Sequence, residues 1–348
     1  MRSLGLVLLI VLVACSPAPL QLTPFAASAP TTQLVHLRID TPIPTQTPRA
    51  LFPSATSTQT AIPTLFPSAT LTSTLDANAP TWTPLPSWTP PPVTAIAQLQ
   101  AHFLLNWPIA NSGAHTLTRA YPYGATNNGR LQVHHGVDLV NALGTPLFAA
   151  ADGTVIYAGD DFMTEFGSDT NYYGYLVVIQ HNFLSPEQLP VFTLYGHMQH
   201  IGVQSGQIVQ ANELIGTVGQ SGIARGPHLH FEVRVGNPFD FGATRNPELW
   251  LQPFPGQGLL AGRVTDADGA VMSGIMLRVQ SNDLTRNAYT YADTTVNSDP
   301  LLGENFTLGD LPPGYYAVTV TLNGRERFSQ SVYVLPDQMT WLDVVLAN

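Results

Sequence analysis

The sequence has no lysine and a single cysteine, and these shortages exclude several kinds of function. Its 13 basic residues are all arginines and are outnumbered by 23 acidic residues, which gives a net charge of −10. Such a chain lacks the cationic surface that a nucleic acid requires, so no nucleic-acid partner is expected. Its one cysteine, Cys15, can form neither an internal disulfide nor a cysteine-based zinc ribbon or redox pair.

The N-terminus has the pattern of an export signal. Arg2 precedes an apolar run of about ten residues, which suits a signal-peptide core and is roughly half the length of a membrane-spanning helix. The run ends Leu-Val-Ala-Cys at Cys15, which resembles the lipobox of bacterial lipoproteins. That resemblance implies a mature protein anchored by lipid at Cys15 on the outer side of a bacterial membrane. The alternative is an ordinary secretory signal in which the cysteine is incidental.

A long proline-rich segment follows. Residues 16–92 are rich in Pro, Thr and Ser, and the hexapeptide at 51–56 recurs at 65–70. Frequent proline removes backbone donors and favours extended conformations, so this segment is predicted to be a disordered, semi-rigid linker. Residues 94–106 have helical spacing and predict a short helix packed on the next domain. The predicted divisions of the chain are 1–15, 16–92, 93–255 and 256–348.

Beyond residue 107 the sequence is typical of β structure. Short β-rich runs are separated by Gly, Asn and Asp turns, at 133–140, 153–158, 176–180, 191–194 and 228–233. A second β-rich unit begins near residue 260, with Asp-Gly and Pro-Gly turns between alternating strands. This unit resembles the carboxypeptidase regulatory-like, transthyretin-type β-sandwich. The fold class is predicted to be mainly β, with an antiparallel first domain and a small C-terminal sandwich.

In the β-rich part of the sequence that begins near residue 107, histidines are the candidates for catalysis or metal binding. The sequence lacks His-Glu-x-x-His, Gly-x-Ser-x-Gly and the glycine-rich phosphate loops. His228 and His230 would share one face of a strand, and the even spacing of His134 and Asp138 returns to one face as well. His197 ends another apolar run. A lone histidine is most often structural, but three such clusters in one domain favour a metal or catalytic site.

Three motifs in order carry a family resemblance. His-x-Gly-x-Asp at 134–138, Tyr-x-His at 195–197 and Gly-Pro-His-Leu-His-Phe-Glu-Val at 226–233 resemble the lysostaphin-type (LytM-type) zinc peptidases of family M23. The resemblance implies that His134, Asp138 and His230 bind Zn2+, with water in the fourth position. It further implies that His197 and His228 are catalytic residues that move protons and stabilise the oxyanion.

Other polar residues near these motifs are given simpler interpretations. His135 is expected to point away from His134, with a substrate contact as the alternative. His181 and His200 are expected at the surface or in structural roles. The acidic segment 160–169 is expected to be a solvated loop, with a border of the substrate groove as the alternative. Three tyrosines either line that groove or pack in the sheet: Tyr172, Tyr173 and Tyr175.

Two functions remain open. The first is a zinc endopeptidase that hydrolyses peptide cross-links of peptidoglycan, acting as a monomer anchored in the cell envelope. The second is a catalytically silent module that binds the wall and activates other hydrolases. Retention of all the presumed ligands and catalytic histidines favours the enzyme. The bond that would be cut stays open between glycine bridges and D-amino-acid cross-links.

Overall fold

The computed structural model describes residues 101–109 and 113–346. The predicted signal peptide, the anchor at Cys15 and the linker at 16–92 lie outside the described residues. In the described part of the chain no helix has the length and apolar character needed to cross a membrane.

The helix predicted for 94–106 is wrong over its described part, because residues 101–106 are not helical. Leu105 instead forms a parallel bridge with Leu251, and its N–H donates to the Trp250 carbonyl over 2.9 Å. The Leu105 side chain is fully buried. Pairing with residues 249–252 thus buries Leu105 and satisfies backbone hydrogen-bonding groups that a helix would otherwise have paired.

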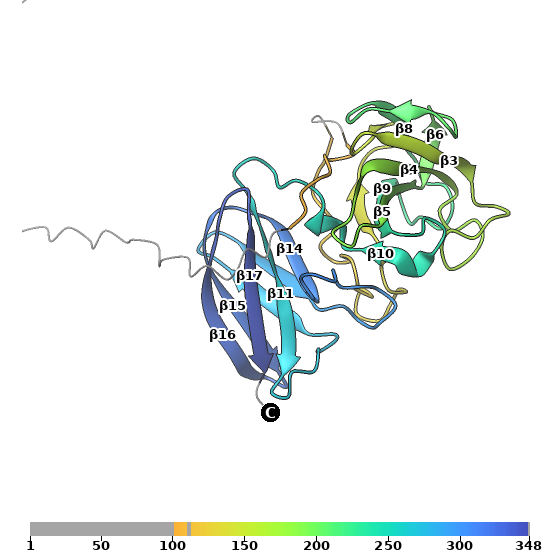
Figure 1. The fold of residues 1–348 in the computed structure, drawn as a ribbon. Helices are drawn as coiled ribbons and strands as arrows, with labels where there is room; N and C mark the ends of the chain where they lie inside the picture. The colour runs from red at the N-terminus through yellow and green to blue at the C-terminus, as the bar shows by residue number, and fades with distance from the viewer. Residues whose placement is uncertain (1–100, 110–112, 347–348) are drawn as a thin grey trace, which may run out of the picture. The chain divides into compact units, whose positions relative to one another are not determined.

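The main sheet contains seven strands and positions the candidate site. Its order is β1 (Val137–Val140), β9 (His228–Val235), β5 (Pro190–Gly196), β4 (Tyr175–Leu184), β3 (Gly153–Asp160) and β7 (Ile208–Val209), with β10 (Thr244–Arg245) also paired to β9 (Figure 1). All of these pairings are antiparallel. The β-rich runs of the sequence all contribute strands, although β1 starts at Val137 rather than at residue 133.

A smaller antiparallel sheet shares the core of the main sheet. It has the order β2 (Pro146–Phe148), β8 (Leu214–Val218) and β6 (Met198–Ile201). Leu147, Ile215 and Met198 from these strands are buried in the same apolar cluster as Leu229 and Phe231 of β9. Within the described residues the helices are two 3-10 turns, η1 (Phe241–Ala243) and η2 (Pro247–Leu249), so the predicted mainly β, antiparallel class is confirmed.

Strand β9 has an apolar face and a polar face, and both are buried. Alternate side chains of a strand point to opposite faces. Leu229, Phe231 and Val233 enter the apolar core, whereas four polar residues occupy the opposite face. Those polar residues are His228, His230, Glu232 and Arg234. The register pairs His230 with Asp138 on β1 and with Gly196 on β5, so the elements that carry the histidine motifs meet near the start of β9.

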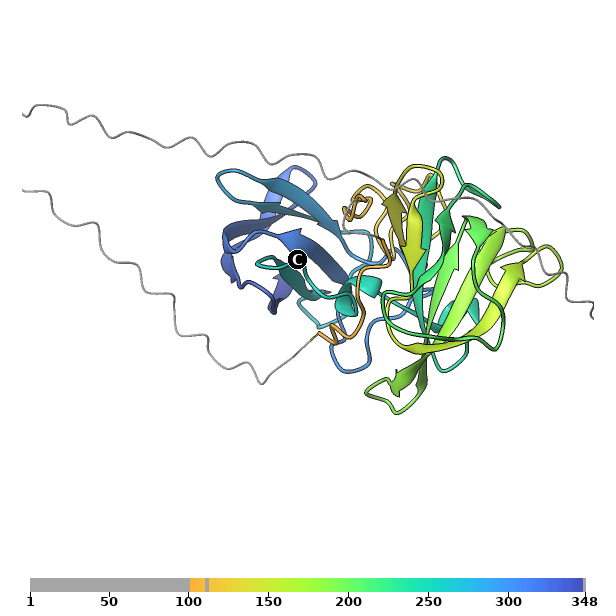
Figure 2. The same cartoon turned by 90° about the horizontal axis from the view of Figure 1, so that it is seen from above.

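Residues 258–346 form two further sheets with a common core. One has the order β14 (Phe306–Leu311), β11 (Gly258–Asp266), β17 (Met339–Leu346), and the other β13 (Thr285–Tyr289), β12 (Met276–Gln280), β15 (Gly314–Leu322), β16 (Arg325–Val334) (Figures 1 and 2). The β11–β17 pairing is parallel. Alternating apolar residues from both sheets bury one another, for example Val264 and Val344 with Leu277 and Val318.

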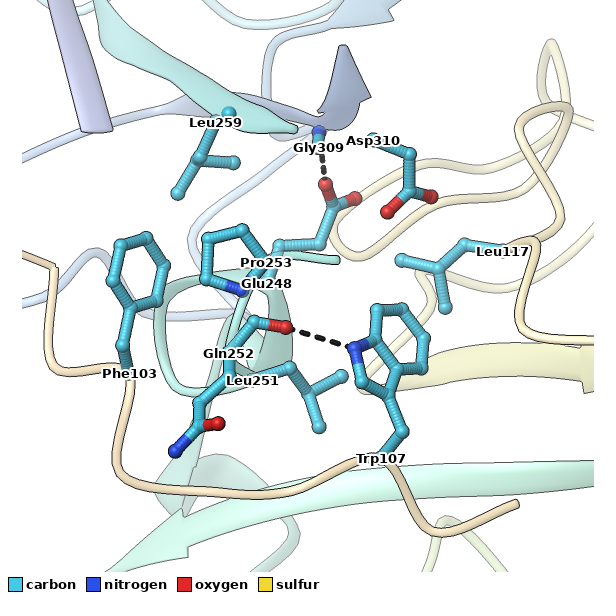
Figure 3. A pocket seen from close by; sticks show the side chains of 11 residues that line it. Phe103, Trp107, Leu117, Glu248, Leu251, Gln252, Pro253, Leu259, Gly309 and Asp310 are labelled. Atoms are coloured by element: carbon cyan, nitrogen blue, oxygen red, sulfur yellow. Dashed lines mark hydrogen bonds between the residues drawn. The ribbon is translucent and has the colours of Figure 1, made fainter. Parts of the chain in front are cut away.

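All described residues belong to one compact unit, and a partly buried cluster of ion pairs links its two β regions. Arg119 donates to Glu248 over 2.8 Å and to Asp310 over 2.7 Å. Figure 3 shows Glu248 also accepting from the backbone N–H of Gly309. Beside it, the Trp107 indole donates to the carbonyl of Gln252 over 2.8 Å. These bonds compensate the cost of burying charge at this contact.

Candidate metal centre

Three side chains from two segments distant in sequence converge on one point. One ligand atom from each of His134, Asp138 and His230 lies within 4.8 Å of the others, a grouping that could hold a metal ion. His134 Nε2 is 3.1 Å from Asp138 Oδ1 and 3.2 Å from His230 Nδ1. His230 Nδ1 is 3.0 Å from the same Asp138 oxygen. The antiparallel register places Asp138 directly opposite His230, and His134 reaches them from the segment before β1.

The donor set fits zinc. A tetrahedral ion with bonds of about 2.0–2.1 Å needs ligand atoms about 3.3 Å apart. The three separations here, 3.0 to 3.2 Å, are close to that value. Two imidazole nitrogens and one carboxylate oxygen are also ligands that zinc prefers. Three protein donors leave one position of a tetrahedron available for water or substrate.

In both histidines of this set, the ring nitrogen that does not face the other ligand atoms makes a hydrogen bond of its own. His134 Nδ1 donates to the Tyr121 carbonyl over 2.7 Å, and the Tyr121 ring stacks on the imidazole at 4.0 Å. His230 Nε2 donates to Glu232 Oε1 over 3.0 Å. In its neutral form each imidazole therefore directs the lone pair of its other nitrogen toward the common point, and these bonds fix both the tautomer and the ring orientation.

Glu232 is the centre of a fully buried network beneath His230. Its Oε2 accepts from Arg234 Nε over 2.7 Å, and its Oε1 accepts from the Tyr173 hydroxyl as well as from His230. Arg234 also donates to the Phe166 carbonyl over 2.7 Å and to the Pro238 carbonyl over 2.9 Å. The guanidinium of Arg234 therefore has several hydrogen-bond acceptors, which offset the cost of burying its ion pair with Glu232.

The charges of this region follow from burial and neighbouring groups. Burial raises the pKa of Asp138, but His134 and His230 outweigh it and hold that pKa well below its usual range. Burial also raises the pKa of Glu232, yet the Arg234 charge and His230 lower it to about 2. For His230 burial lowers the pKa, while the bonds to the two carboxylates raise it to about 9. Both carboxylates are therefore anionic at neutral pH, as a cation site requires.

Two further histidines lie beside the donor set. His197 follows the last residue of β5 with a left-handed φ of 59°, and its ring centroid is 4.7 Å from that of His228. The Nδ1 atoms donate to backbone carbonyls, His197 to Ser221 and His228 to Gly226, each over 2.8 Å. Burial lowers the pKa of His197 to about 3 and lowers that of His228 as well. Both rings are therefore neutral at neutral pH, with a lone pair on Nε2.

These five residues line a common groove with a volume of about 510 Å³. His228 Nε2 is 3.6 Å from Asp138 Oδ1, so the catalytic candidates adjoin the donor set directly. The rest of the wall comes from loops: Tyr121, Arg130, Leu131, Gln132, Ser168, Asp169, Tyr172, Ile223 and Arg225. The sequence-predicted metal ligands and catalytic histidines are all brought together at this one place.

The remaining predictions have mixed outcomes. His135 turns away from the groove, stacks on Phe241 at 3.7 Å and is bonded to Thr244, which is a structural role. His181 is buried and bonded to Thr193, whereas His200 is exposed, as expected.

The acidic segment 160–169 is not simply a solvated loop. Asp161 is fully buried and accepts the N–H groups of Tyr173 and Gly174, and Phe166 packs in a small apolar cluster. Asp169, by contrast, is exposed and borders the groove. Of the three tyrosines, Tyr172 lines the groove, Tyr173 is buried in the Glu232 network, and Tyr175 is exposed.

Sequence reasoning missed the supporting residues. Glu232 and Arg234 continue the alternation of His228 and His230 along β9, so an unbroken row of polar residues on one strand face was the available signal. Tyr121 carries no comparable signal, because it reaches the site from a loop. Tyr173 was expected in the groove or in the sheet, and its bond to Glu232 was not foreseen.

Comparison with known proteins identifies the first β region. Residues 132–241 match the model of Peptidase family M23, so the chain carries an M23 peptidase domain. A Pseudomonas aeruginosa protein named Lipoprotein NlpD/LppB homolog is 36% identical over 126 residues, which cover 35% of this chain and 37% of that protein. Peptidoglycan DD-endopeptidase ShyC of Vibrio cholerae is 34% identical over 119 residues, covering 34% of this chain and 23% of that protein.

Among solved structures, the catalytic domain of the antimicrobial peptidase lysostaphin from Staphylococcus simulans is 28% identical, with a TM-score of 0.29. That match covers 36% of this chain and 83% of that one. The chain spans less than two fifths of the length of the two curated relatives.

Proposed function

We propose that the M23 peptidase domain of this chain is a zinc-dependent endopeptidase that hydrolyses peptide cross-links of bacterial peptidoglycan. The observation that carries the proposal is the convergence of His134, Asp138 and His230 in a groove that His197 and His228 also line. The relative named as a peptidoglycan DD-endopeptidase supports this substrate class. We propose further that residues 93–255 hold the activity, and that a lipid at Cys15 keeps a monomeric enzyme in the cell envelope.

The chain's own residues account for the proton transfers of such a reaction. A zinc ion bound by the three donors would polarise the scissile carbonyl and acidify a bound water. His197 and His228 each donate Nδ1–H to a backbone carbonyl, which leaves Nε2 as a proton acceptor. One ring can take the proton of the attacking water, and a protonated ring can donate to the oxyanion or the leaving amine. The Glu232 network prevents His230 from rotating during these steps.

The second candidate function is a wall-binding module that activates other hydrolases. It is favoured by the match to a protein named as an NlpD/LppB homolog. Against it, this chain keeps a complete donor set and two neutral histidines beside it, features that binding alone does not require.

The decisive experiment measures zinc content and wall-peptide hydrolysis together. Asp138→Ala and His230→Ala should lose zinc, because each removes one of three donors. His197→Ala and His228→Ala should keep about one equivalent of zinc while turnover falls by roughly two to four orders of magnitude.

Two results would count against the proposal. Loss of metal from His197→Ala or His228→Ala, as complete as from His230→Ala, would overturn the division of roles. A zinc-loaded wild type that releases no new amino terminus from purified walls, yet stimulates another hydrolase, would establish the activating module instead.

A further inference from the structure

The arginines of residues 101–255 divide into two groups. Arg119, Arg234 and Arg245 each contact a carboxylate within the described residues. The other two, Arg130 and Arg225, contact no carboxylate of the described residues, and both line the groove of the metal centre. In a chain with a net charge of −10 and no lysine, the unpaired cations of this region are thus concentrated at the site.

Arg130 is presented by an ordered turn close to the donor set. The Leu131 N–H donates to the Thr126 carbonyl over 3.0 Å, and the Gly129 N–H donates to the Thr126 hydroxyl over 2.9 Å. The turn ends four residues before His134, whose N–H bonds the Ala125 carbonyl over 3.0 Å. The backbone that carries Arg130 is therefore tied to the backbone that carries a candidate ligand.

Arg225 reaches the same wall from the loop before β9. Burial raises the pKa of the Tyr121 phenol, and the charge of Arg225 opposes that rise, so the guanidinium is within electrostatic reach of Tyr121. Arg225 lines the groove together with Tyr121, whose ring stacks on His134 at 4.0 Å. Both arginines are exposed, so their donors are available to a bound molecule.

The charges that line the groove favour an anionic group. Its acidic residues are Asp138 and Asp169, and Asp138 belongs to the donor set. Two guanidinium groups therefore face one uncommitted carboxylate, that of Asp169. A guanidinium binds a carboxylate through two parallel hydrogen bonds, a geometry that an ammonium group does not provide.

We propose that Arg130 and Arg225 form a carboxylate subsite, so that the groove takes an acidic peptide whose free carboxylate lies beside the bond to be cut. This inference rests on the proposed peptidase function and narrows its substrate class. Peptides in which that carboxylate is amidated bind less tightly, because the amide offers a weaker acceptor and no charge.

The test compares two forms of one peptide mixture. Soluble peptides from purified peptidoglycan are used with their carboxyl groups free or after conversion to amides. Binding to the metal-free, full-length protein is measured by calorimetry, and hydrolysis is measured after zinc is restored. The wild type should prefer the free acids, and Arg130→Gln and Arg225→Gln should each reduce that preference by about fivefold, mainly through KM. Arg327→Gln, at an exposed arginine of β16, is the matched control and should keep the wild-type preference.

The outcomes separate this inference from the proposed function. Equal binding of free and amidated peptides by the wild type, or the same preference in all three variants, would overturn the subsite even if hydrolysis proceeds. Arg-dependent preference in binding without hydrolysis would support the subsite and count against the peptidase.

Discussion

Replacement of Glu232 by glutamine is the sharpest test of how the metal centre is held. The side chain keeps its size, but one carboxylate oxygen becomes an amide that donates hydrogen bonds. Glu232 accepts three donors in the folded protein, from His230 Nε2, the Tyr173 hydroxyl and Arg234 Nε. A carboxylate can accept all three, whereas an amide cannot, so one partner of the network must lose its acceptor.

Each orientation of the amide has its own consequence. If its oxygen faces Arg234, its NH2 group faces His230 Nε2, which must then become an acceptor. The His230 proton moves to Nδ1, the atom that lies 3.0 Å from Asp138 and 3.2 Å from His134, and metal binding is blocked. If the oxygen faces His230, a buried guanidinium with no exposed surface is opposed by an NH2 group, at a cost of about 3–5 kcal/mol.

Glu232→Gln should therefore lower zinc affinity by about 10- to 100-fold, or destabilise the fold by several kcal/mol, or both. Competition with a chromophoric chelator measures the affinity, and urea unfolding measures the stability. Glu187→Gln is the matched control, because Glu187 is partly exposed and 3.8 Å from Arg245, and it should cost less than about 1 kcal/mol with unchanged affinity. The reasoning is refuted if Glu232→Gln behaves like this control in both assays.

Three other predictions follow from particular residues. Gly136→Ala should weaken metal binding and lower the free energy of unfolding by about 1–3 kcal/mol, because a Cβ there would lie 2.5 Å from the Phe231 carbonyl oxygen. Gly226→Ala is the control, because a Cβ there meets nothing within 4 Å. It should change neither quantity in the same chelator and urea assays. Burial raises the pKa of Glu304 to about 8 from 4.5, so the folded state binds this proton more tightly and stability should fall as the pH rises from about 4.5 through 8. Glu304→Gln should flatten that dependence, and a wild-type slope in the variant would contradict the assignment. Cys15→Ser should abolish labelling by a fatty-acid analogue, and unchanged labelling would rule out the anchor.

Much of the candidate site was predictable because strand periodicity is a local property. The spacing of His228 and His230 placed both on one face of a strand, and the structure has them there. The position of Asp138 opposite His230 depends on register, which no short stretch of sequence specifies. The family resemblance, rather than spacing, had brought these two residues together. His134 lies before β1 rather than in a longer strand, so its proximity to Asp138 comes from a loop conformation.

The errors have a shared physical cause. Residues 101–106 fit a helical pattern, but partners far along the chain, at 249–252, satisfy their backbone in another conformation. Asp161 was expected in a solvated loop because a buried carboxylate is rare. It is buried here because the backbone N–H groups of Tyr173 and Gly174, just before β4, need an acceptor. In both places tertiary contacts outweigh a local preference, and the sequence near the residue does not contain that information.

The division of β9 into an apolar face and a polar face also disfavours incorrect pairing of this strand during folding. A slip of one residue in its pairing would exchange the faces, so that four polar side chains, among them the charged Glu232 and Arg234, would enter the apolar core while Leu229, Phe231 and Val233 left it. Each unpaired charge moved into such surroundings costs several kcal/mol. Misaligned sheets are therefore far less stable than the native one, and a molecule that has folded at all has already assembled the side chains of its candidate metal centre in their correct order.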